Sequence, residues 1–193
     1  MANNLDAHFW NQKYAACDTP WNIAQASPPL TNYIDQLSDK SLKILIPGAG
    51  HAHEANYLLD KGFTDVTICD ISEIAIENLK KNIPEGDITL IKGDFFELSG
   101  KYDIILEQTF FCALPPSMRI NYTEKTYELL NDGGKLVGVL FDRHFEKEGP
   151  PFGGTKEEYE KLFLEKFYIQ KMEKCYNSIG PRLGYELFFI CVR

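Results

Sequence analysis

Lys43-Ile44-Leu45-Ile46-Pro47-Gly48-Ala49-Gly50 is the stretch of sequence that decides the fold. Residues 43–47 form a short, β-rich apolar run that ends in a glycine turn, and residues 54–61 then follow a helical pattern. A strand, a glycine turn and a helix in this order form the first unit of an α/β domain. Gly48 and Gly50 let the backbone turn tightly and approach a ligand without a Cβ in the way.

The same alternation of strands and helices continues along the chain. Strands are predicted at 65–69, 88–91, 102–106 and 135–141, and helices at 74–81, 118–130 and 156–164, with Asn131-Asp132-Gly133-Gly134 ending the helix at 118–130. The last two strand-like runs, 167–176 and 185–192, have no helix between them and are expected to pair as a hairpin. The prediction is an α/β fold: a Rossmann-like, doubly wound, mostly parallel sheet of about seven strands with a C-terminal antiparallel hairpin.

The leading segment, residues 1–40, is expected to be an N-terminal helical cap. A short amphipathic helix is predicted over residues 6–16, and the prolines of Thr19-Pro20-Trp21 and Ser27-Pro28-Pro29 are expected to interrupt regular structure after it. The chain shows no internal repeat and no linker long enough to separate two domains. A single domain spanning residues 1–193 is therefore the expectation.

Composition limits the classes of function. With a formal net charge of -8 in 193 residues, the chain lacks the clustered Lys and Arg that a nucleic-acid surface needs, so a small-molecule substrate fits better. The 5 cysteines are widely spaced without a C-x-x-C pair, which predicts neither a disulfide framework nor a zinc site. Without a signal peptide or a run of about 18 apolar residues, no membrane is expected and a cytoplasmic location is predicted.

Three features follow the ends of the first three predicted strands. They are the glycine turn, then Asp70, twenty residues after Gly50, and then Asp94-Phe95. Ligands of open α/β sheets bind outside the carboxyl ends of the strands, where Asp70 could take both hydroxyls of a ribose and Asp94-Phe95 could meet an adenine. Each feature also has a structural interpretation, because glycines shape many βα turns, Asp70 or Ser72 could cap a helix, and Asp94 could be a turn residue. Their coincidence with strand ends favours a ligand site.

The glycine pattern also separates classes of cofactor. A dinucleotide fingerprint has a third glycine three residues after the second, where this chain has His53. No G-x-x-x-x-G-K-[ST] loop is present either, so a nucleoside triphosphate site lacks its main support. His51 and His53 flank the turn without companion ligands, so no metal is predicted.

A set of motifs spread along nearly the whole chain carries a family resemblance. The motifs are Trp10, Trp21, Pro47-Gly48-Ala49-Gly50, Asp70-Ile71-Ser72, Gly93-Asp94-Phe95-Phe96, Thr109 to Leu114 with Met118-Arg119, and Gly149-Pro150-Pro151-Phe152. In these motifs the chain resembles the thiopurine S-methyltransferase superfamily. Within the superfamily, Phe110-Phe111-Cys112-Ala113 before Met118-Arg119 and the Gly-Pro-Pro-aromatic turn are closest to the halide and thiol methyltransferases of plants.

The resemblance implies S-adenosylmethionine as cofactor and assigns expected roles to particular residues. An aromatic cage around the methionine end would suit a sulfonium cation, with Tyr14 in place of a usual tryptophan. Glu107 would meet the cofactor amino group or shape the substrate pocket, and it is also the candidate catalytic residue. The acceptor pocket would include Gln108, Phe111 and Phe152. The expected cofactor-binding set is Trp10, Tyr14, Trp21, Gly48, Gly50, Asp70, Ile71, Asp94 and Phe95.

Some positions depart from the family pattern. Ala49 stands in place of a cysteine, Ala52 of a glycine, Glu54 of an aspartate and Gln108 of an aromatic residue or arginine. These changes put the identity of the acceptor in doubt more than cofactor binding. Cys112, set among apolar residues, is interpreted as core packing rather than a nucleophile, and Arg119 as structural.

The leading functional hypothesis is in-line methyl transfer to a thiol or halide-type nucleophile, by alignment and desolvation and without a required base. The alternatives are an O- or N-methyltransferase of a small metabolite with Glu107 as base, a cofactor-binding relative without activity, and, disfavoured by the glycine pattern, an oxidoreductase. A monomer is the default expectation, and the sequence does not name the acceptor.

Overall fold

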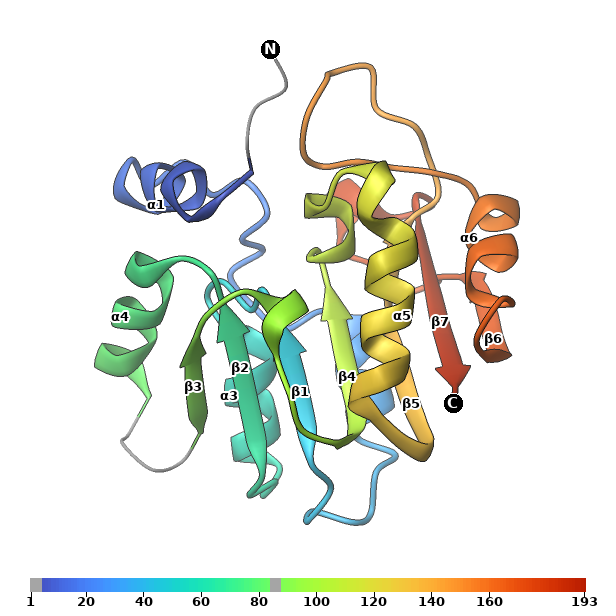
Figure 1. The fold of residues 1–193 in the computed structure, drawn as a ribbon, viewed down its shortest axis with the longest axis horizontal. Helices are drawn as coiled ribbons and strands as arrows, with labels where there is room; N and C mark the ends of the chain where they lie inside the picture. The colour runs from blue at the N-terminus through green and yellow to red at the C-terminus, as the bar shows by residue number, and fades with distance from the viewer. Residues whose placement is uncertain (1–4, 84–87) are drawn as a thin grey trace.

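One seven-stranded sheet organises the chain, in the order β3-β2-β1-β4-β5-β7-β6 (Figure 1). The computed structural model describes residues 5–83 and 88–193. Neighbouring strands are parallel from β3 to β5, while β7 runs antiparallel to both β5 and β6. The strands are β1 Ile44–Pro47, β2 Val66–Asp70, β3 Thr89–Lys92, β4 Tyr102–Gln108, β5 Leu130–Phe141, β6 Tyr168–Lys174 and β7 Glu186–Val192. The predicted mostly parallel sheet with a C-terminal antiparallel hairpin is confirmed.

Helices cover both faces of this sheet, as a doubly wound fold requires. The α-helices are α1 Ala7–Ala15, α2 Pro28–Ile34, α3 His53–Asp60, α4 Glu73–Asn82, α5 Arg119–Leu129 and α6 Lys156–Phe163. Short 3₁₀ turns are η1 Phe95–Glu97, η2 Phe111–Ala113, η3 Pro116–Met118 and η4 Gly180–Arg182. Side chains of Asp6, Ser72 and Thr155 accept backbone N–H groups at the starts of α1, α4 and α6, which fixes where these helices begin.

Each face of the sheet has its own apolar core. On one face, Tyr122 and Leu129 of α5 and Phe163 of α6 pack against β4, β5 and β7. On the other face, side chains of α2, α3 and α4 pack against β1, β2 and β4, with Leu30 and Leu58 fully buried. With both faces covered, ligands have access to the sheet only along its strand-end edges.

Two boundary predictions were wrong. Pro28 and Pro29 do not interrupt structure but start α2, because the first turn of a helix has no use for the N–H that proline lacks. Residues 131–134 do not end a helix, since α5 stops at Leu129 and β5 begins at Leu130. Leu130 is fully buried and pairs with Tyr102, so the chain enters the sheet directly from the helix.

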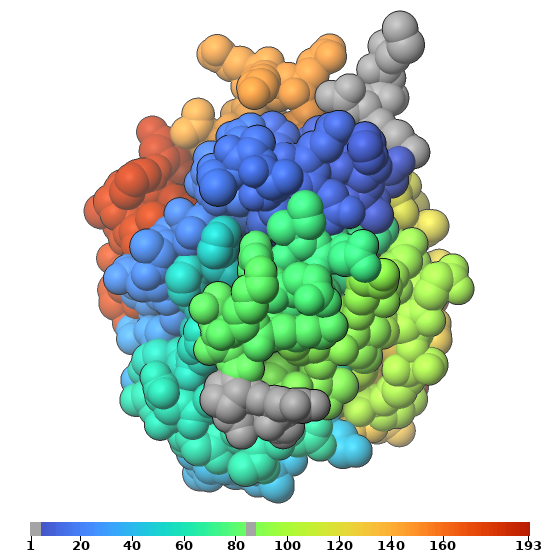
Figure 2. All heavy atoms as spheres, turned by 90° about the vertical axis from the view of Figure 1, so that its left-hand side faces the viewer, coloured from blue at the N-terminus to red at the C-terminus, as the bar shows by residue number. Residues whose placement is uncertain are grey.

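The expected N-terminal cap is present. Helix α1 lies against α4 above the sheet (Figure 1). Figure 2 shows the N-terminal segment in blue across the top of the side of the molecule that carries α4. Oδ1 of Asn11 accepts hydrogen bonds from the Ser72 hydroxyl (2.7 Å) and from the Ile74 N–H (3.3 Å). This contact docks α1 on the start of α4. Within the described ranges, every helix is too short or too polar to cross a membrane.

Candidate active site

The glycine turn after β1 lies at the carboxyl edge of the sheet, at its centre. Gly48 and Gly50 have φ angles of +57° and +56°, in the left-handed region that favours glycine. A Cβ on Gly48 would collide with the ring of Phe110, and one on Gly50 would lie 3.1 Å from the Tyr14 hydroxyl. Both glycines are therefore required by conformation and by the close approach of aromatic side chains.

Asp70, the last residue of β2, turns its carboxylate towards this turn. Its Oδ2 accepts the Gly50 N–H (3.3 Å) and its Oδ1 the Ser72 N–H (2.8 Å). Burial raises the pKa of Asp70 to about 6, although these two hydrogen bonds act in the opposite direction. Ser72, not Asp70, caps α4. Ile71 is half-buried between them.

Asp94 and Phe95 follow β3 and differ in exposure. Asp94 is exposed and its Oδ1 accepts the Phe96 N–H (2.9 Å), so it does form a turn, with its carboxylate at the surface. Phe95 is only 3% exposed and packs against the rings of Phe110 and Tyr122, with centroids at 5.2 and 5.7 Å. The Phe95 ring thus belongs to the core beside the edge, and its expected contact with an adenine stays a prediction.

Three aromatic residues of the cap gather at the glycine turn. The rings of Trp10 and Tyr14, both on α1, lie edge-on to Trp21 with centroids 5.5 and 5.7 Å away. The Tyr14 hydroxyl and the Trp21 indole nitrogen both lie close to Gly50. The structure thus brings together residues that are separated by up to 60 positions in the sequence, Trp10 and Asp70 among them, at one edge of the sheet.

A pocket opens between the segment Trp21–Gln25, the glycine turn, the start of α3 and the end of β4. Gln108, the last residue of β4, and Thr109, which follows it, form one wall of the pocket. Gln108 Oε1 accepts the Thr109 hydroxyl (2.9 Å), whereas its buried Nε2 makes no hydrogen bond within the described chain. His51 and His53 stack at 5.9 Å on the opposite wall, and desolvation lowers the pKa of both imidazoles.

Glu107 does not face this pocket. The residue is fully buried, its Oε1 accepts the N–H groups of Phe110 (2.8 Å) and Phe111 (2.9 Å), and its Oε2 accepts the Tyr122 hydroxyl (3.0 Å). Burial raises the pKa of Glu107 to about 7. This carboxyl group shapes the chain after β4, and the geometry gives no support to the expected catalytic role.

The other expected acceptor residues also lie away from the pocket. Phe111 is fully buried among Tyr122, Tyr159 and Phe163, because η2 turns its ring into the core rather than towards the edge. Phe152 is half-buried, and its N–H donates to the Cys112 carbonyl (2.6 Å). Of the three expected acceptor residues, only Gln108 lines the pocket.

Cys112 and Arg119 have the structural settings expected of them. The Cys112 thiol is buried, burial raises its pKa, and Sγ contacts the Thr109 carbonyl (3.3 Å). Arg119 donates to the Gly153 carbonyl (2.8 Å) and lies over the Phe111 ring. Neither side chain therefore has its reactive group at the pocket.

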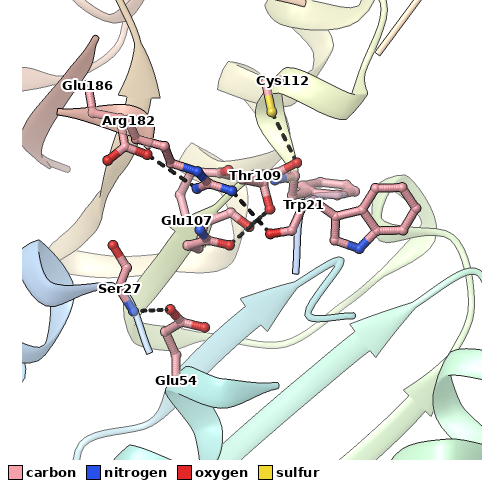
Figure 3. A network of polar contacts seen from close by, with 10 residues as sticks. Trp21, Ser27, Glu54, Glu107, Thr109, Cys112, Arg182 and Glu186 are labelled. Carbon is pink, nitrogen blue, oxygen red and sulfur yellow. Dashed lines mark hydrogen bonds and ion pairs between the residues drawn. The ribbon is translucent and has the colours of Figure 1, made fainter. Parts of the chain in front are cut away.

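Sequence reasoning missed several residues that hold the site together. Arg182 of η4 donates to the Trp21 carbonyl (3.1 Å) and to Glu186 (3.2 Å), and the buried Glu54 carboxylate accepts the Ser27 N–H (2.9 Å) (Figure 3). Asn11 anchors α1 as described above. No local pattern marks these residues, because each acts on a segment distant in the sequence. Among the described residues, no group of three His, Cys, Asp or Glu could hold a metal ion.

Comparison with known proteins shows which family and which relatives this chain is similar to. The model of the thiopurine S-methyltransferase (TPMT) family matches residues 5–184. A probable thiol methyltransferase 2 of Arabidopsis thaliana is 29% identical, over 92% of this chain and 81% of its own length. Thiocyanate methyltransferase 1 of Brassica oleracea is 28% identical, over 96% of this chain and 85% of its own length.

Solved structures support the fold. The 1,6-didemethyltoxoflavin-N1-methyltransferase of Burkholderia thailandensis, with S-adenosylhomocysteine bound, aligns with a TM-score of 0.75 at 17% identity. The alignment covers 97% of this chain and 86% of that one.

Proposed function

The chain belongs to the thiopurine S-methyltransferase family, and from this premise we propose that it methylates a small, polarisable nucleophile, a thiol or a halide-type anion. It is an S-adenosylmethionine-dependent methyltransferase that acts on small molecules. The acceptor class and the residue roles that follow are the proposal.

The edge of the sheet fits the cofactor. Gly48 and Gly50 form a tight turn at the carboxyl edge, where the absence of a Cβ lets the rings of Phe110, Tyr14 and Trp21 approach the backbone closely. Asp70 is a buried carboxylate at the end of β2, placed to receive ribose hydroxyls, and Asp94 offers an exposed carboxylate to an adenine amino group. Bound S-adenosylmethionine supplies a methyl group on a positively charged sulfur.

The three aromatic residues of the N-terminal cap, called the aromatic cover below, have a separate role. Trp10, Tyr14 and Trp21 gather at the glycine turn, and a group of aromatic rings there would favour a sulfonium cation. The same rings exclude water, so an anionic acceptor that enters the pocket loses part of its hydration and meets the cation at close range. Alignment and desolvation by these residues account for the rate enhancement that we propose.

The observation that favours this acceptor class is the placement of Glu107, although His51, His53 and Glu54 also line the pocket and could accept a proton. An oxygen or nitrogen acceptor of high pKa needs a general base within hydrogen-bond reach, and Glu107 was the leading candidate. Its two carboxylate oxygens are instead engaged by the loop after β4 and by Tyr122. Halides arrive as anions and thiols ionise near pH 8.5, so neither requires a carboxylate base.

Gln108 supports an anionic acceptor. Its Nε2 is a buried donor at the pocket wall without a hydrogen-bond partner in the described chain. An unsatisfied buried donor costs about 1–3 kcal/mol, a penalty that an anion or a sulfur acceptor in the pocket would relieve. Gln108→Leu, which removes the amide at similar size, should raise KM for iodide and thiols.

The first experiment tests the cofactor site by calorimetric titration with S-adenosylhomocysteine. The parent protein should bind one equivalent, Asp70→Ala should lose that binding, and Asp60→Ala, which changes an exposed aspartate at the end of α3, should keep it. Circular dichroism establishes that each variant is folded. Absence of binding in the folded parent would overturn the cofactor assignment.

The second experiment tests the acceptor class with iodide, thiocyanate, a small thiol, a phenol and an amine. Turnover of iodide should stay level between about pH 6 and 9, whereas thiol turnover should rise with the ionised fraction of the thiol. Turnover of only the phenol or the amine would favour the O- or N-methyltransferase alternative. Cofactor binding without turnover of any acceptor would favour the inactive alternative.

A further inference from the structure

The segment that carries Trp21 contributes no buried side chain to the hydrophobic core. Between α1 and α2, none of residues 16–26 is buried, and Trp21 itself is only half-buried. A segment without buried side chains gains little stability from packing, so polar contacts determine where it lies. Its position matters here, because the Trp21 indole forms part of the aromatic cover over Gly50.

Besides the Lys13–Asp18 ion pair with α1, three polar contacts tie this segment and its end to the rest of the fold. His53 pairs with the Asn22 side chain (2.8 Å), the Ser27 N–H donates to Glu54 (2.9 Å), and Arg182 donates to the Trp21 carbonyl (3.1 Å). The Arg182 contact has a charged donor and the Ser27 contact a carboxylate acceptor, and hydrogen bonds of both kinds are stronger than neutral ones. The Arg182 contact joins residues 161 positions apart in the sequence.

Arg182 is held rigidly on its own side. Its backbone N–H and carbonyl are both hydrogen-bonded within η4 and the turn that follows, to Ile179 and Tyr185. Its guanidinium pairs with Glu186 at the start of β7 (3.2 Å) and lies over the Phe141 ring at 5.4 Å. Both side chains of the pair are buried, at 10% and 3% exposure. A planar guanidinium fixed in this way presents its remaining N–H in one direction.

The charge of Arg182 also suits its surroundings. Within residues 5–83 and 88–193 it is the one buried basic side chain, and the buried Glu186 and Glu54 both lie near it (Figure 3). Burial raises the pKa of Glu54, while the backbone hydrogen bonds and the charge of Arg182 act in the opposite direction. Arg182 is therefore the cation that stabilises this buried polar cluster, whose member Glu54 also lines the pocket.

We propose that Arg182 is a positioning residue for methyl transfer, which holds the Trp21 segment, and with it the aromatic cover, in place over the cofactor edge. The inference rests on the proposed function, because it assigns the cover to the cofactor. Without the Arg182 contact, the segment keeps its tethers at Asn22 and Ser27 and the side-chain contact of Trp21 with Tyr14, but it loses the hydrogen bond to the Trp21 backbone carbonyl. The cover then spends less time closed, and cofactor binding weakens.

The test uses Arg182→Met, Arg182→Lys and the double variant Arg182→Met with Glu186→Leu. The double variant removes both buried charges, which keeps the fold accessible where the single variant would leave Glu186 unpaired. We expect Arg182→Met and the double variant to bind S-adenosylhomocysteine about 10- to 100-fold more weakly, corresponding to the loss of one charge-assisted hydrogen bond. KM for S-adenosylmethionine should rise while kcat at saturation changes little, and Arg182→Lys should recover part of the loss.

Tryptophan fluorescence reports on the hydration of the Trp21 segment, because Trp10 and Trp21 are the 2 tryptophans of the chain. Emission of the ligand-free double variant should shift to longer wavelength as Trp21 becomes more hydrated. The matched control is Arg193→Met, which removes a guanidinium that donates to the carbonyls of Tyr127 (3.1 Å) and Leu130 (2.5 Å) at the opposite edge of the sheet. It should lower the melting temperature without changing emission or affinity.

Failure of this inference and failure of the proposed function give different results. A folded parent that does not bind S-adenosylhomocysteine contradicts the proposed function, and the emission of ligand-free variants still tests the tether. A double variant with the emission and the affinity of the parent overturns the role of Arg182.

Discussion

Glu107→Gln is expected to keep methyl transfer and to raise stability around neutral pH. A glutamine fits the contacts of the glutamate, because its carbonyl oxygen can accept the N–H groups of Phe110 and Phe111. Its NH₂ group can then donate to the Tyr122 hydroxyl, which reverses that hydrogen bond instead of breaking it. The substitution therefore preserves the loop after β4 and removes only the titration of a buried carboxyl group.

The magnitude follows from the pKa of Glu107, which burial raises from an ordinary value of 4.5 to about 7. Folding thus favours the protonated form, so this contribution to stability is fully present below pH 4.5 and is lost as the pH rises to 7. At about 1.4 kcal/mol for each pKa unit, the loss amounts to about 3 kcal/mol above neutral pH. The glutamine side chain in Glu107→Gln does not titrate, so the variant should not lose this stability as the pH rises.

The assay is urea denaturation of both proteins between pH 4.5 and 8.5, with kcat/KM for iodide and a thiol at each pH. The difference in free energy of unfolding should grow in favour of the variant up to about pH 7 and then stay constant. Tyr122→Phe is the matched control: it removes one donor to the carboxylate, so stability should fall and the pH of the transition should rise. A folded Glu107→Gln enzyme that has lost turnover at every pH would refute the reasoning and restore Glu107 as the base.

Three further predictions concern the cap and the glycine turn. Ala52→Gly should change the free energy of unfolding in urea by less than about 1 kcal/mol, since relief of the φ of +55° is offset by the loss of a buried methyl group and by the chain entropy of glycine. Gly48→Ala should lower the melting temperature and S-adenosylhomocysteine affinity together, because the added methyl group collides with Phe110 at a left-handed backbone position. Asn11→Ala should raise KM for S-adenosylmethionine about tenfold in steady-state assays, with a smaller change in kcat, because α1 loses both contacts to the start of α4.

The sheet could be predicted because its signals are local. Strands β1 and β2 are short apolar runs buried on both faces, each followed by a turn and a helical pattern, and the glycine turn at Gly48 separates the first strand from its helix without ambiguity. The errors fell where two local signals compete. Pro28 both disfavours a preceding helix and starts a new one, and Gly133 lies inside β5 with a φ of +77° although glycine pairs usually end elements.

The cofactor edge was predictable for a related reason. The carboxyl ends of parallel strands meet at one edge, so strand order alone brings Gly50 and Asp70 together, and their contact follows. The directions of Glu107 and Phe111 were not predictable in this way. Both depend on how the chain folds back after β4, where η2 turns Phe111 into the core and directs two N–H groups at Glu107. A residue after a strand end is placed by the loop, and the loop is held by tertiary contacts.

Arg182 represents the class of residue that no local pattern reveals. The aromatic cover is recognisable in the sequence because tryptophans are rare and large, but its position over the glycine turn depends on backbone groups such as the Trp21 carbonyl, which every residue has. The side chain that binds this carbonyl comes from the turn between the last two strands, which the antiparallel hairpin brings back to the carboxyl edge of the sheet. In a doubly wound fold the C-terminal hairpin is therefore more than an extension of the sheet. In the proposed role of Arg182, the hairpin returns a cation to the carboxyl edge and couples the order of the cap to its own integrity, so substitutions near Glu186 should act on cofactor affinity at a distance.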